Sequence, residues 1–425
     1  MRDGEKTSIP GWEAQRMTTS ERKREDAEIR KDFPLLNPET AYLDNSATTQ
    51  KPRQVLEAVS HYYESENANP LRGLYQLSLK ATDSYEQARE AVRAFIHAKS
   101  TEEIIFTRNA TESLNLVGYS WTADNLKPED EILITILEHH SNMLPWQQAA
   151  KRTGATLKYL ECDKNGNITE EDFRRAITPK TKLVCMTHVS NVIGRTNDLK
   201  TFARIAHEYG AVFVADGAQS VPHMPVDVQD LDVDFLAFSG HKMLSPMGIG
   251  VLYGKKEILD AMQPFLYGGE MIEYVTREGA TYAELPHKFE AGTVNAGGAV
   301  GLHAAIQYIN SIGFDKIQER EDHLTAYAME KIKEIPEVHI LGSDDPKEHH
   351  GILTFTVDGV HPHDIAAMMD EDHVDVRAGH HCAQPLLKFL GTMSTARASF
   401  SFYNTEEEAD RLVDSMKTLR KRMGY

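Results

Sequence analysis

The sequence predicts an α/β protein: a mostly parallel seven-stranded sheet between helices, followed by a smaller α+β domain. Short apolar runs rich in β-branched residues alternate with longer helical stretches over the first two-thirds of the chain. Several of these runs end on a polar or charged residue, and ligands of parallel sheets bind at the carboxyl ends of the strands. The chain has 425 residues, 41% of them hydrophobic, which is enough for a large domain and a small one.

The strand and helix candidates follow one another along the chain in the order that such a sheet requires. Strands are expected at 102–107, 131–137, 156–160, 182–187, 211–216, 233–239 and 248–254. Helices are expected between most of them, at 52–66, 111–121, 142–154, 169–177 and 199–210. The residues that follow the strand ends therefore become the candidates for a binding site.

The pattern changes after the apolar stretch 299–313. A charged helix (315–335), a strand (352–357), a helix near 363–371, a loop around Cys382, a strand-like run (395–403) and a terminal helix (406–424) follow. We predict a flexible tail at 1–18 and a segment at 19–39 that packs with the small domain. The large domain is then expected at 40–313, and the small domain with the Cys382 loop at 314–425.

Charge and composition exclude some classes of function. The net charge of −18 argues against nucleic acid or an anionic membrane as the main partner, because both require a basic surface. No apolar stretch approaches the roughly 20 residues of a membrane helix, and the first residues have no secretory h-region. The three cysteines, without a pairing pattern, fit a reducing compartment, so we expect a cytoplasmic protein that starts at Met1 or at Met17.

Two residues that follow apolar runs suit pyridoxal phosphate (PLP) chemistry. Lys242 ends DFLAFSGHK, in a context with few other charges, and a desolvated lysine can form a Schiff base. Asp216 ends AVFVAD, and a carboxylate there can keep a pyridine nitrogen protonated. Taken singly, the lysine could be a solvated cation and the aspartate a turn residue.

A helix start after the first strand can bind a phosphate. In TRNATESLNLV, Thr111 lies at or near the N-cap, which indicates a capping box, an anion site, or both. Ser239 and His241 add hydrogen-bond donors beside Lys242. His139, one of two histidines after the strand 131–137, can lie over a pyridine ring and exchange protons, although a metal or surface role is the alternative.

Cys382 is the one cysteine with the surroundings of a reactive thiol. Arg377, His380 and His381 are expected to favour its thiolate form. Cys185 reads as an inert core residue, and Cys162 as partly exposed without activating partners. A zinc site made from His361, His363, His381 and Cys382 is the alternative, but the spacing is not that of a standard zinc motif, and no intrinsic metal is expected. Arg397 lies in an apolar run, and a buried arginine needs an anionic partner. That partner is either a substrate carboxylate or an internal carboxylate.

The chain resembles the cysteine desulfurases of the SufS type (group II), which are fold type I PLP enzymes of the class V aminotransferase family. The resemblance is carried by YLDNSATTQKP, EHHSNMLPW, THVSNVIG, ADGAQSV, FSGHKMLSPMGIGVLYG, FEAGTVN, RAGHHCAQPL and TARASFSFYNTEEEADRL. It covers nearly the whole chain, and the motifs are specific together.

The resemblance implies a transferase that converts L-cysteine to L-alanine and collects the sulfur as a persulfide on Cys382. An acceptor protein would then take the sulfur for iron–sulfur cluster assembly. The implied catalytic residues are Lys242, Cys382 and His139. The implied PLP-binding residues are Lys242, Asp216, Gln219, His139, Thr111, Ala110, Ser239, His241, Asn191 and, from the second subunit of a homodimer, Thr293. The implied substrate-binding residues are Arg397, Asn191 and Arg377.

Two further features bear on partners and specificity. The HPHD segment resembles the form that works with a zinc-containing SufU-type acceptor, in which His363 would bind the partner's zinc. Tyr75 stands where relatives commonly have histidine, near the expected entrance of the active site. The alternative activities on this scaffold are selenocysteine lyase and cysteine sulfinate desulfinase, and a non-catalytic sulfur-relay protein is the alternative from another class.

Overall fold

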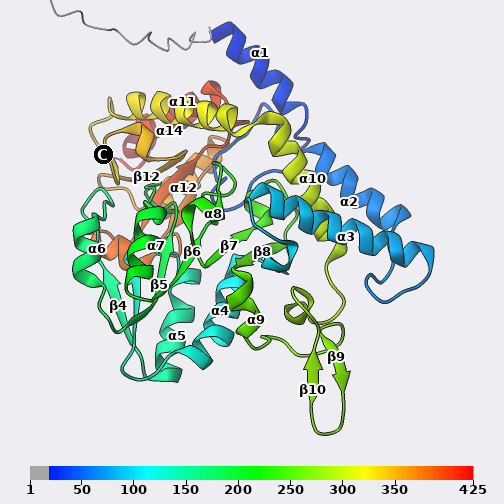
Figure 1. Ribbon diagram of the computed structural model, residues 1–425. Helices are drawn as coiled ribbons and strands as arrows, with labels where there is room; N and C mark the ends of the chain where they lie inside the picture. Colours follow the sequence, from blue (N-terminus) through cyan, green and yellow to red (C-terminus); the bar gives the residue numbers. More distant parts are fainter. Residues whose placement is uncertain (1–18, 425) are drawn as a thin grey trace, which may run out of the picture.

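The computed structural model describes residues 19–424 and is built around one large sheet (Figure 1). Its seven strands lie in the order β2-β8-β7-β6-β5-β3-β4. The strands are β2 (Ile104–Thr107), β3 (Glu131–Thr135), β4 (Thr156–Leu160), β5 (Thr181–Thr187), β6 (Val212–Asp216), β7 (Phe235–Ser239) and β8 (Gly250–Gly254). Strands β4, β3, β5, β6 and β7 pair in parallel, whereas β8 is antiparallel to both of its neighbours. The predicted mostly parallel sheet is confirmed.

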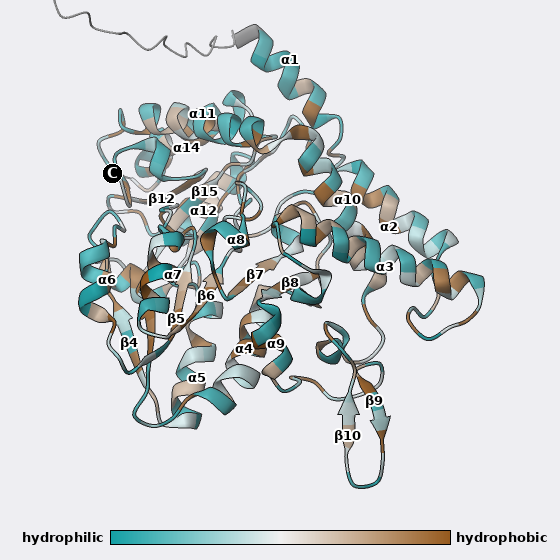
Figure 2. Cartoon of the chain, in the orientation of Figure 1, coloured by the Kyte–Doolittle hydropathy of each residue, from teal (hydrophilic) through white to brown (hydrophobic). Residues whose placement is uncertain are grey.

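The middle of each central strand is apolar because both faces of the sheet are covered. In β5, Val184 and Met186 join one hydrophobic cluster, while Leu183 and Cys185 join the cluster on the other face. Successive side chains of a strand point to opposite faces, so a run without alternation fits only a strand that is buried on both sides. The same strands are hydrophobic in Figure 2.

Helices cover the two faces of this sheet. One cluster includes side chains of α2, α3, α7 and α10, and the other includes side chains of α4, α5 and α9. The helices of this part are α2 (Arg53–Ser65), α3 (Gln76–Phe95), α4 (Ala110–Asn125), α5 (Leu144–Thr153), α6 (Glu170–Ala176), α7 (Leu199–Glu208), α8 (Val228–Leu231), α9 (Lys256–Ala261) and α10 (Ala296–Ile312). Short 3₁₀ turns lie at η1 (Thr101–Glu103), η2 (His140–Asn142), η3 (Gly240–Lys242) and η4 (His287–Phe289).

The C-terminal part has its own sheet and its own apolar core. The sheet order is β11-β12-β15-β14, and all its pairs are antiparallel. Its elements are α11 (Phe314–Ile332), β11 (Val338–Ile340), η5 (Pro346–Glu348), β12 (Ile352–Val357), α12 (Pro362–Glu371), β13 (Val374–Asp375), β14 (Arg377–Gly379), α13 (Gln384–Phe389), β15 (Thr395–Ser399) and α14 (Glu406–Arg422). The residue boundaries predicted for the domains stay a prediction.

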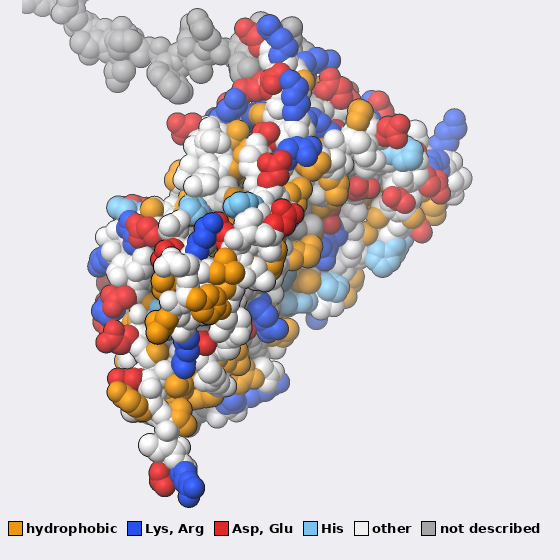
Figure 3. All heavy atoms as spheres, turned by 90° about the vertical axis from the view of Figure 1, so that its right-hand side faces the viewer, with side chains coloured by type: hydrophobic (Ala, Val, Ile, Leu, Met, Phe, Trp, Pro, Cys, Tyr) orange, Lys and Arg blue, Asp and Glu red, His pale blue; other side chains and the backbone are white. Residues whose placement is uncertain are grey.

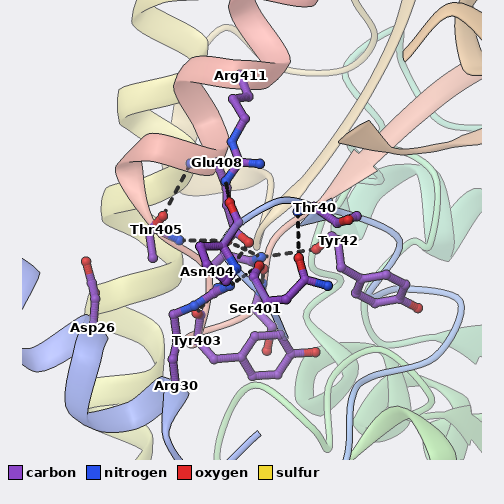
Figure 4. A network of polar contacts seen from close by, with 12 residues as sticks. Asp26, Arg30, Thr40, Tyr42, Ser401, Tyr403, Asn404, Thr405, Glu408 and Arg411 are labelled. Carbon is purple, nitrogen blue, oxygen red and sulfur yellow. Dashed lines mark hydrogen bonds and ion pairs between the residues drawn. The ribbon is translucent and has the colours of Figure 1, made fainter. Parts of the chain in front are cut away.

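The N-terminal helix α1 (Thr19–Arg30) packs against this C-terminal part through charged side chains (Figure 4). The Arg30 guanidinium donates to the Glu408 carboxylate at 3.0 Å and to the Tyr403 carbonyl at 3.2 Å. Glu408 is buried, and a buried carboxylate needs such a partner. The short strand β1 (Ala41–Tyr42) then pairs in parallel with β13, so residues 19–42 contact the C-terminal part before the chain enters the large sheet. The predicted tail 1–18 and Met17 lie outside the described residues.

Several elements were not expected from the sequence patterns, among them a long helix and a hairpin. Helix α3 was not among the expected helices, and the hairpin of β9 (Ile272–Val275) and β10 (Ala280–Tyr282) was not expected at all. This hairpin projects from the body of the molecule (Figure 1). Within residues 19–424, no helix has the length and apolarity needed to cross a bilayer.

Candidate active site

The carboxyl ends of the parallel strands meet at a cavity of about 200 Å³. Most of the residues predicted for the site line it, although they come from distant parts of the chain. They are Ala110, Thr111, His139, Asn191, Asp216, Gln219, Ser239, His241, Lys242, Arg377, Cys382 and Arg397. Sequence reasoning therefore identified the wall of this cavity, because parallel strands bring their ends to one edge of the sheet.

Lys242 and Asp216 occupy the floor of the cavity from neighbouring strands. Lys242 lies in the turn η3 directly after β7, and Asp216 is the last residue of β6. Burial lowers the pKa of the Lys242 amine to about 8, and the nearby Asp216 opposes that shift. Burial raises the pKa of Asp216, against the effect of the Ala218 amide, which donates to its Oδ1 at 3.0 Å, and of Lys242. The amine is thus close to the neutral form that a nucleophile needs.

His139 contributes a neutral imidazole to the cavity. Its Nδ1 accepts a hydrogen bond from the Ser141 amide at 3.0 Å, as the N-cap of η2. Burial, with Lys242 as the next cause, lowers the pKa of His139 to about 3. Because Nδ1 accepts, the proton of the neutral ring lies on Nε2.

The start of helix α4 lines the cavity, and Thr111 lies near its cap, as expected. The N-cap is Asn109, whose side chain accepts from the Glu112 amide at 3.0 Å, and Thr111 lies inside the first turn. The amide of Ala110 donates to Ser239 Oγ at 2.8 Å, and the Thr111 and Ser141 hydroxyls are 2.7 Å apart. Together with the positive end of the helix dipole, these hydroxyls suit a phosphate group.

Buried polar atoms without partners face this region. Among the described residues, Gln219 Oε1 and His241 Nδ1 are buried and have no hydrogen-bond partner, although the Gln219 amide donates to the Ser46 carbonyl at 2.9 Å. Buried polar groups are almost always satisfied in folded proteins. Two such atoms on the wall of one cavity indicate a ligand with polar groups at those positions.

The Cys382 loop enters the cavity from the C-terminal part. The Cys382 carbonyl accepts from the His140 amide at 2.7 Å, and the His381 carbonyl accepts from Asn191 Nδ2 at 2.8 Å. Both His381 and Cys382 have positive φ angles, 49° and 55°, which is uncommon for residues other than glycine and costs free energy. These two bonds hold the loop in that conformation and place the thiol in the cavity.

His381 does not act on the thiol as the sequence suggested. Burial, followed by the charges of Arg397 and Arg377, lowers the pKa of His381 to about 3, so the ring is neutral near pH 7. Its Nε2 is 2.8 Å from Thr395 Oγ1. The expectation that His381 favours the thiolate as a cation was therefore wrong, because a buried imidazole beside two arginines does not take up a proton.

Arg397 has an internal partner and a free donor. Its Nη2 is 3.3 Å from Asp44 Oδ1, and its Nη1 donates to the Asn191 carbonyl at 2.8 Å. Its Nε is buried without a partner. Arg377 is the cross-strand neighbour of Arg397, so two guanidinium groups share the nearby carboxylate Asp44. Asp44 neutralises only one of these two positive charges. The arginines can therefore bind both the internal carboxylate and the carboxylate of a substrate.

The remaining cysteines lie away from the cavity wall. Cys185 is fully buried in the large sheet, as expected, and burial raises the pKa of its thiol. Cys162 is also buried, which corrects the expected partial exposure, and burial raises its pKa to about 11. Among residues 19–424, no group of three or more His, Cys, Asp or Glu is placed to hold a metal ion.

Three residues singled out in the sequence lie outside the cavity wall. Thr293 is exposed and lines a separate hollow of about 550 Å³. His363 is exposed in the first turn of α12, and the His361 ring caps that helix. Tyr75 is the N-cap of α3, with 56% of its surface exposed.

Sequence reasoning gave no role to two acidic residues behind the site, although Glu138 was among the residues expected after a strand end. Asp44 pairs with Arg397 from the segment between β1 and α2, and no spacing in the sequence links the two. Glu138 is fully buried and binds Asn142 Nδ2 at 2.5 Å and the Thr187 amide at 3.0 Å. Burial raises the pKa of Glu138 to about 8. The signal for Glu138 in the sequence was its position directly after an apolar run.

The groups in this cavity fit PLP. A near-neutral lysine, a buried carboxylate, a neutral imidazole and a helix start with hydroxyl groups can serve the aldehyde, the pyridine nitrogen, the ring face and the phosphate, respectively. The unpartnered Gln219 and His241 atoms leave hydrogen-bonding capacity for the same molecule. The cavity is thus that of a PLP enzyme with a cysteine thiol in its wall.

Comparisons with known proteins agree. The Aminotransferase class-V family matches residues 41–412. A probable cysteine desulfurase of Halalkalibacterium halodurans is 51% identical over 403 residues, which are 94% of this chain and 98% of that protein. A cysteine desulfurase structure from Thermococcus onnurineus has a TM-score of 0.90 at 44% identity, covering 93% of this chain and 98% of that one. The cysteine desulfurase CsdA of Escherichia coli has a TM-score of 0.87 at 37% identity, with the same coverage. The chain belongs to the class V aminotransferase family of PLP-dependent enzymes and, within it, to the cysteine desulfurases.

Proposed function

We propose that the protein is a SufS-type desulfurase that converts L-cysteine to L-alanine and holds the released sulfur as a persulfide on Cys382. The observation that carries this proposal is the position of Cys382, which lines the same cavity as Lys242 although the two lie in different parts of the fold. The overall reaction is balanced without an oxidant: L-cysteine and the Cys382 thiol give L-alanine and the Cys382 persulfide.

The substrate is positioned by its carboxylate. Arg397, with its unpartnered Nε, binds that group, and Arg377 and Asn191 lie on the same wall. Arg397 is held by Asn191 and Asp44, so its guanidinium has a fixed direction. A fixed anion site of this kind orients the Cα hydrogen and the sulfur of the substrate relative to the reacting groups.

The chain's own residues then move protons and sulfur. Lys242, whose pKa is about 8, takes the Cα proton as a base and returns it to Cα when alanine forms. The Cys382 thiolate attacks the substrate sulfur, and the bond between that sulfur and the substrate carbon breaks. That carbon takes up the proton that the Cys382 thiol released, and His139 can donate a hydrogen bond from Nε2 to the reacting groups. PLP, held by Lys242 and paired with Asp216, supplies an electron sink for the Cα carbanion.

We further propose that the sulfur passes to a SufU-type acceptor protein for iron–sulfur cluster assembly. His363 is exposed at the start of α12, in the C-terminal part that also carries the Cys382 loop. An exposed imidazole at a helix start is free to bind a metal ion that a partner presents. The sequence HPHD and the identity to named cysteine desulfurases support this assignment.

A homodimer is the assembly that we propose. Thr293 does not line the cavity of its own chain but a hollow outside it, so it would serve the site of a second copy. Figure 3 shows hydrophobic side chains on the surface of one face of the molecule. Among the large hydrophobic residues that are exposed are Leu74, Leu77, Tyr267 and Tyr274. Exposed apolar patches of this kind are typical of association surfaces.

The test of the activity is intact-mass analysis after brief exposure of the PLP-loaded protein to cysteine without reductant. We expect one added sulfur, located on the Cys382 peptide, together with released alanine. Cys382→Ala should retain PLP and bind cysteine but gain no sulfur, while Cys185→Ala serves as the matched control at a buried cysteine.

Each other result contradicts the proposal in a different way. Alanine without a persulfide would indicate a selenocysteine lyase or a cysteine sulfinate desulfinase, which a comparison of the three substrates would separate. Absence of both products would indicate a sulfur-relay protein without catalysis. Sulfur transfer by Cys382→Ala at the normal rate would refute the role of the thiol.

The acceptor proposal has its own test. His363→Ala should lose most of the stimulation of turnover by a zinc-containing SufU-type acceptor but keep the basal rate, because His363 lies outside the cavity wall. His339→Ala, at another exposed histidine, is the control. Full stimulation of the His363→Ala protein would exclude the zinc contact.

A further inference from the structure

The segment Ser46–Lys51 passes from the cavity wall to the back of the turn that carries Lys242. Ser46 and Ala47 line the cavity, whereas Thr48, Thr49 and Lys51 do not. The sequence SATTQK is part of a motif that carried the family resemblance, but none of its residues had received a role.

Four donors of this segment bind the carbonyl oxygen of His241, the residue directly before Lys242. It accepts from the Thr49 amide at 3.1 Å, from Thr48 Oγ1 at 3.1 Å, from Thr49 Oγ1 at 3.2 Å and from Lys51 Nζ at 3.1 Å. A carbonyl oxygen has two lone pairs, so four donors saturate it. The His241–Lys242 peptide therefore cannot rotate without breaking several bonds.

Thr49 also binds the other side of the same turn. Its Oγ1 accepts from the Leu244 amide at 2.9 Å. Leu244 has a φ of 68°, a left-handed conformation that costs free energy for a residue with a branched side chain. One hydroxyl thus connects the peptide before Lys242 with the strained residue after Met243.

Lys51 places a half-buried charge at this point without a carboxylate partner. Its ammonium donates to the His241 carbonyl at 3.1 Å, to Thr48 Oγ1 at 3.3 Å and to the Thr49 carbonyl. Among the described residues no carboxylate forms an ion pair with it, and burial lowers its pKa to about 8. Removing an unpaired lysine from water costs free energy, which these three hydrogen bonds offset.

We propose that Thr48, Thr49 and Lys51 are positioning residues for Lys242. They fix the His241 carbonyl before Lys242 and the Leu244 amide two residues after it. In this way they set the direction in which the Lys242 amine enters the cavity. They act through the backbone and do not touch the cavity themselves. This inference rests on the proposed role of Lys242 as the residue that holds PLP.

The test compares Thr49→Val, which keeps the shape and removes the hydroxyl, with Thr49→Ser, which keeps the hydroxyl. Apo protein is mixed briefly with PLP, borohydride fixes any PLP joined to a lysine, and the modified peptide is identified by mass. We expect Thr49→Val to trap about tenfold less PLP on Lys242 than wild type, and Thr49→Ser to trap nearly as much as wild type, since small misplacements of a reacting group cost large factors.

Thr325→Val is the matched control for lost stability. Thr325 is buried, and its hydroxyl donates to the Glu321 carbonyl within α11, far from the cavity. This variant should show a similar fall in thermal midpoint with unchanged trapping. The steady-state constants add a second measure: Thr49→Val should lower kcat about tenfold with little change in KM, because Arg397 still binds the substrate.

Lys51→Met provides an independent variant. It should reduce the trapping on Lys242 as Thr49→Val does, although it removes an unpaired half-buried charge and need not lower the thermal midpoint. If wild type itself traps no PLP on Lys242, the proposed function fails. If wild type traps PLP there and both Thr49→Val and Lys51→Met match Thr325→Val, the positioning role is refuted while the proposed function stands.

Discussion

Burial moves the pKa values of single residues in the cavity away from their ordinary values. The pKa of Lys242 falls to about 8 and the pKa of His139 to about 3, in each case mainly through burial. The sequence suggested a reactive lysine, because its neighbours are apolar, but it could not give the state of the histidine. Whether an imidazole is charged depends on the groups around it, and those come from distant segments.

The lowered pKa of Lys242 predicts how the stability of the apo protein depends on pH. Below pH 8 Lys242 is protonated in both the folded and the unfolded chain, and burial makes that charge unfavourable only in the folded state. Lys242→Met should therefore be more stable than wild type at pH 7, by as much as about 3 kcal/mol. The difference should shrink as the pH rises from about 8 through 10.5, above which the amine is neutral in both states.

Thermal midpoints of the two apo proteins, measured from pH 7 to pH 10 at one protein concentration, check this. Lys164→Met, at an exposed lysine, is the control and should show no such convergence. A difference between Lys242→Met and wild type that is constant with pH would contradict the pKa shift of the lysine.

At the scale of elements, the Cys382 loop depends on contacts with the large sheet. Its conformation includes two consecutive residues with positive φ, and Asn191 Nδ2 binds the His381 carbonyl from the segment after β5. The loop is therefore held by another element rather than by its own sequence, which contains no glycine at these two positions.

Asn191→Ala should loosen this loop. A hydrogen bond of this kind contributes about 1 kcal/mol, so the alkylation of Cys382 by iodoacetamide in the apo protein should become about fivefold faster. Peptide mass analysis over time measures the rate. Asn125→Ala removes an amide that donates to the Trp121 carbonyl, away from the loop, and should leave the rate as it is. Equal rates for both variants would show that Asn191 does not restrain the loop.

At the scale of the whole molecule, the position of Thr293 predicts an active site shared between two copies. Thr293 lies outside the cavity of its own chain, while Lys242 lies inside it. In a symmetric dimer, each site would then combine Lys242 of one subunit with Thr293 of the other.

Mixed dimers test this arrangement. Lys242→Ala is expected to be inactive, and Thr293→Val to bind PLP weakly. When the two variants are mixed and allowed to exchange subunits, hybrid dimers should contain one site with both residues intact, restoring up to about a quarter of the wild-type activity. Activity that stays at the sum of the separate variants, under conditions where mass spectrometry detects hybrids, would exclude the shared site.

The sequence by itself determined the order of strands and helices and most of the cavity wall. Strands such as β6 and β7, apolar up to their last residue, can only lie inside a covered parallel sheet, and the polar residues at and after the ends of such strands must then meet at one edge. That is why Asp216, Lys242, His139 and Asn191 could be named in advance. Helix α3 and the hairpin β9–β10 were missed because their faces are decided by what they pack against.

Only the tertiary structure decided the contacts between segments that are far apart in the chain. The pairing of Asp44 with Arg397, the neutral state of His381, and the contacts of Thr49 and Lys51 with the turn of Lys242 all join distant residues. Local patterns report on neighbours along the chain, whereas burial and hydrogen bonding depend on neighbours in space. The sequence therefore identified the residues that face the cavity, and the fold decided how they are charged and held.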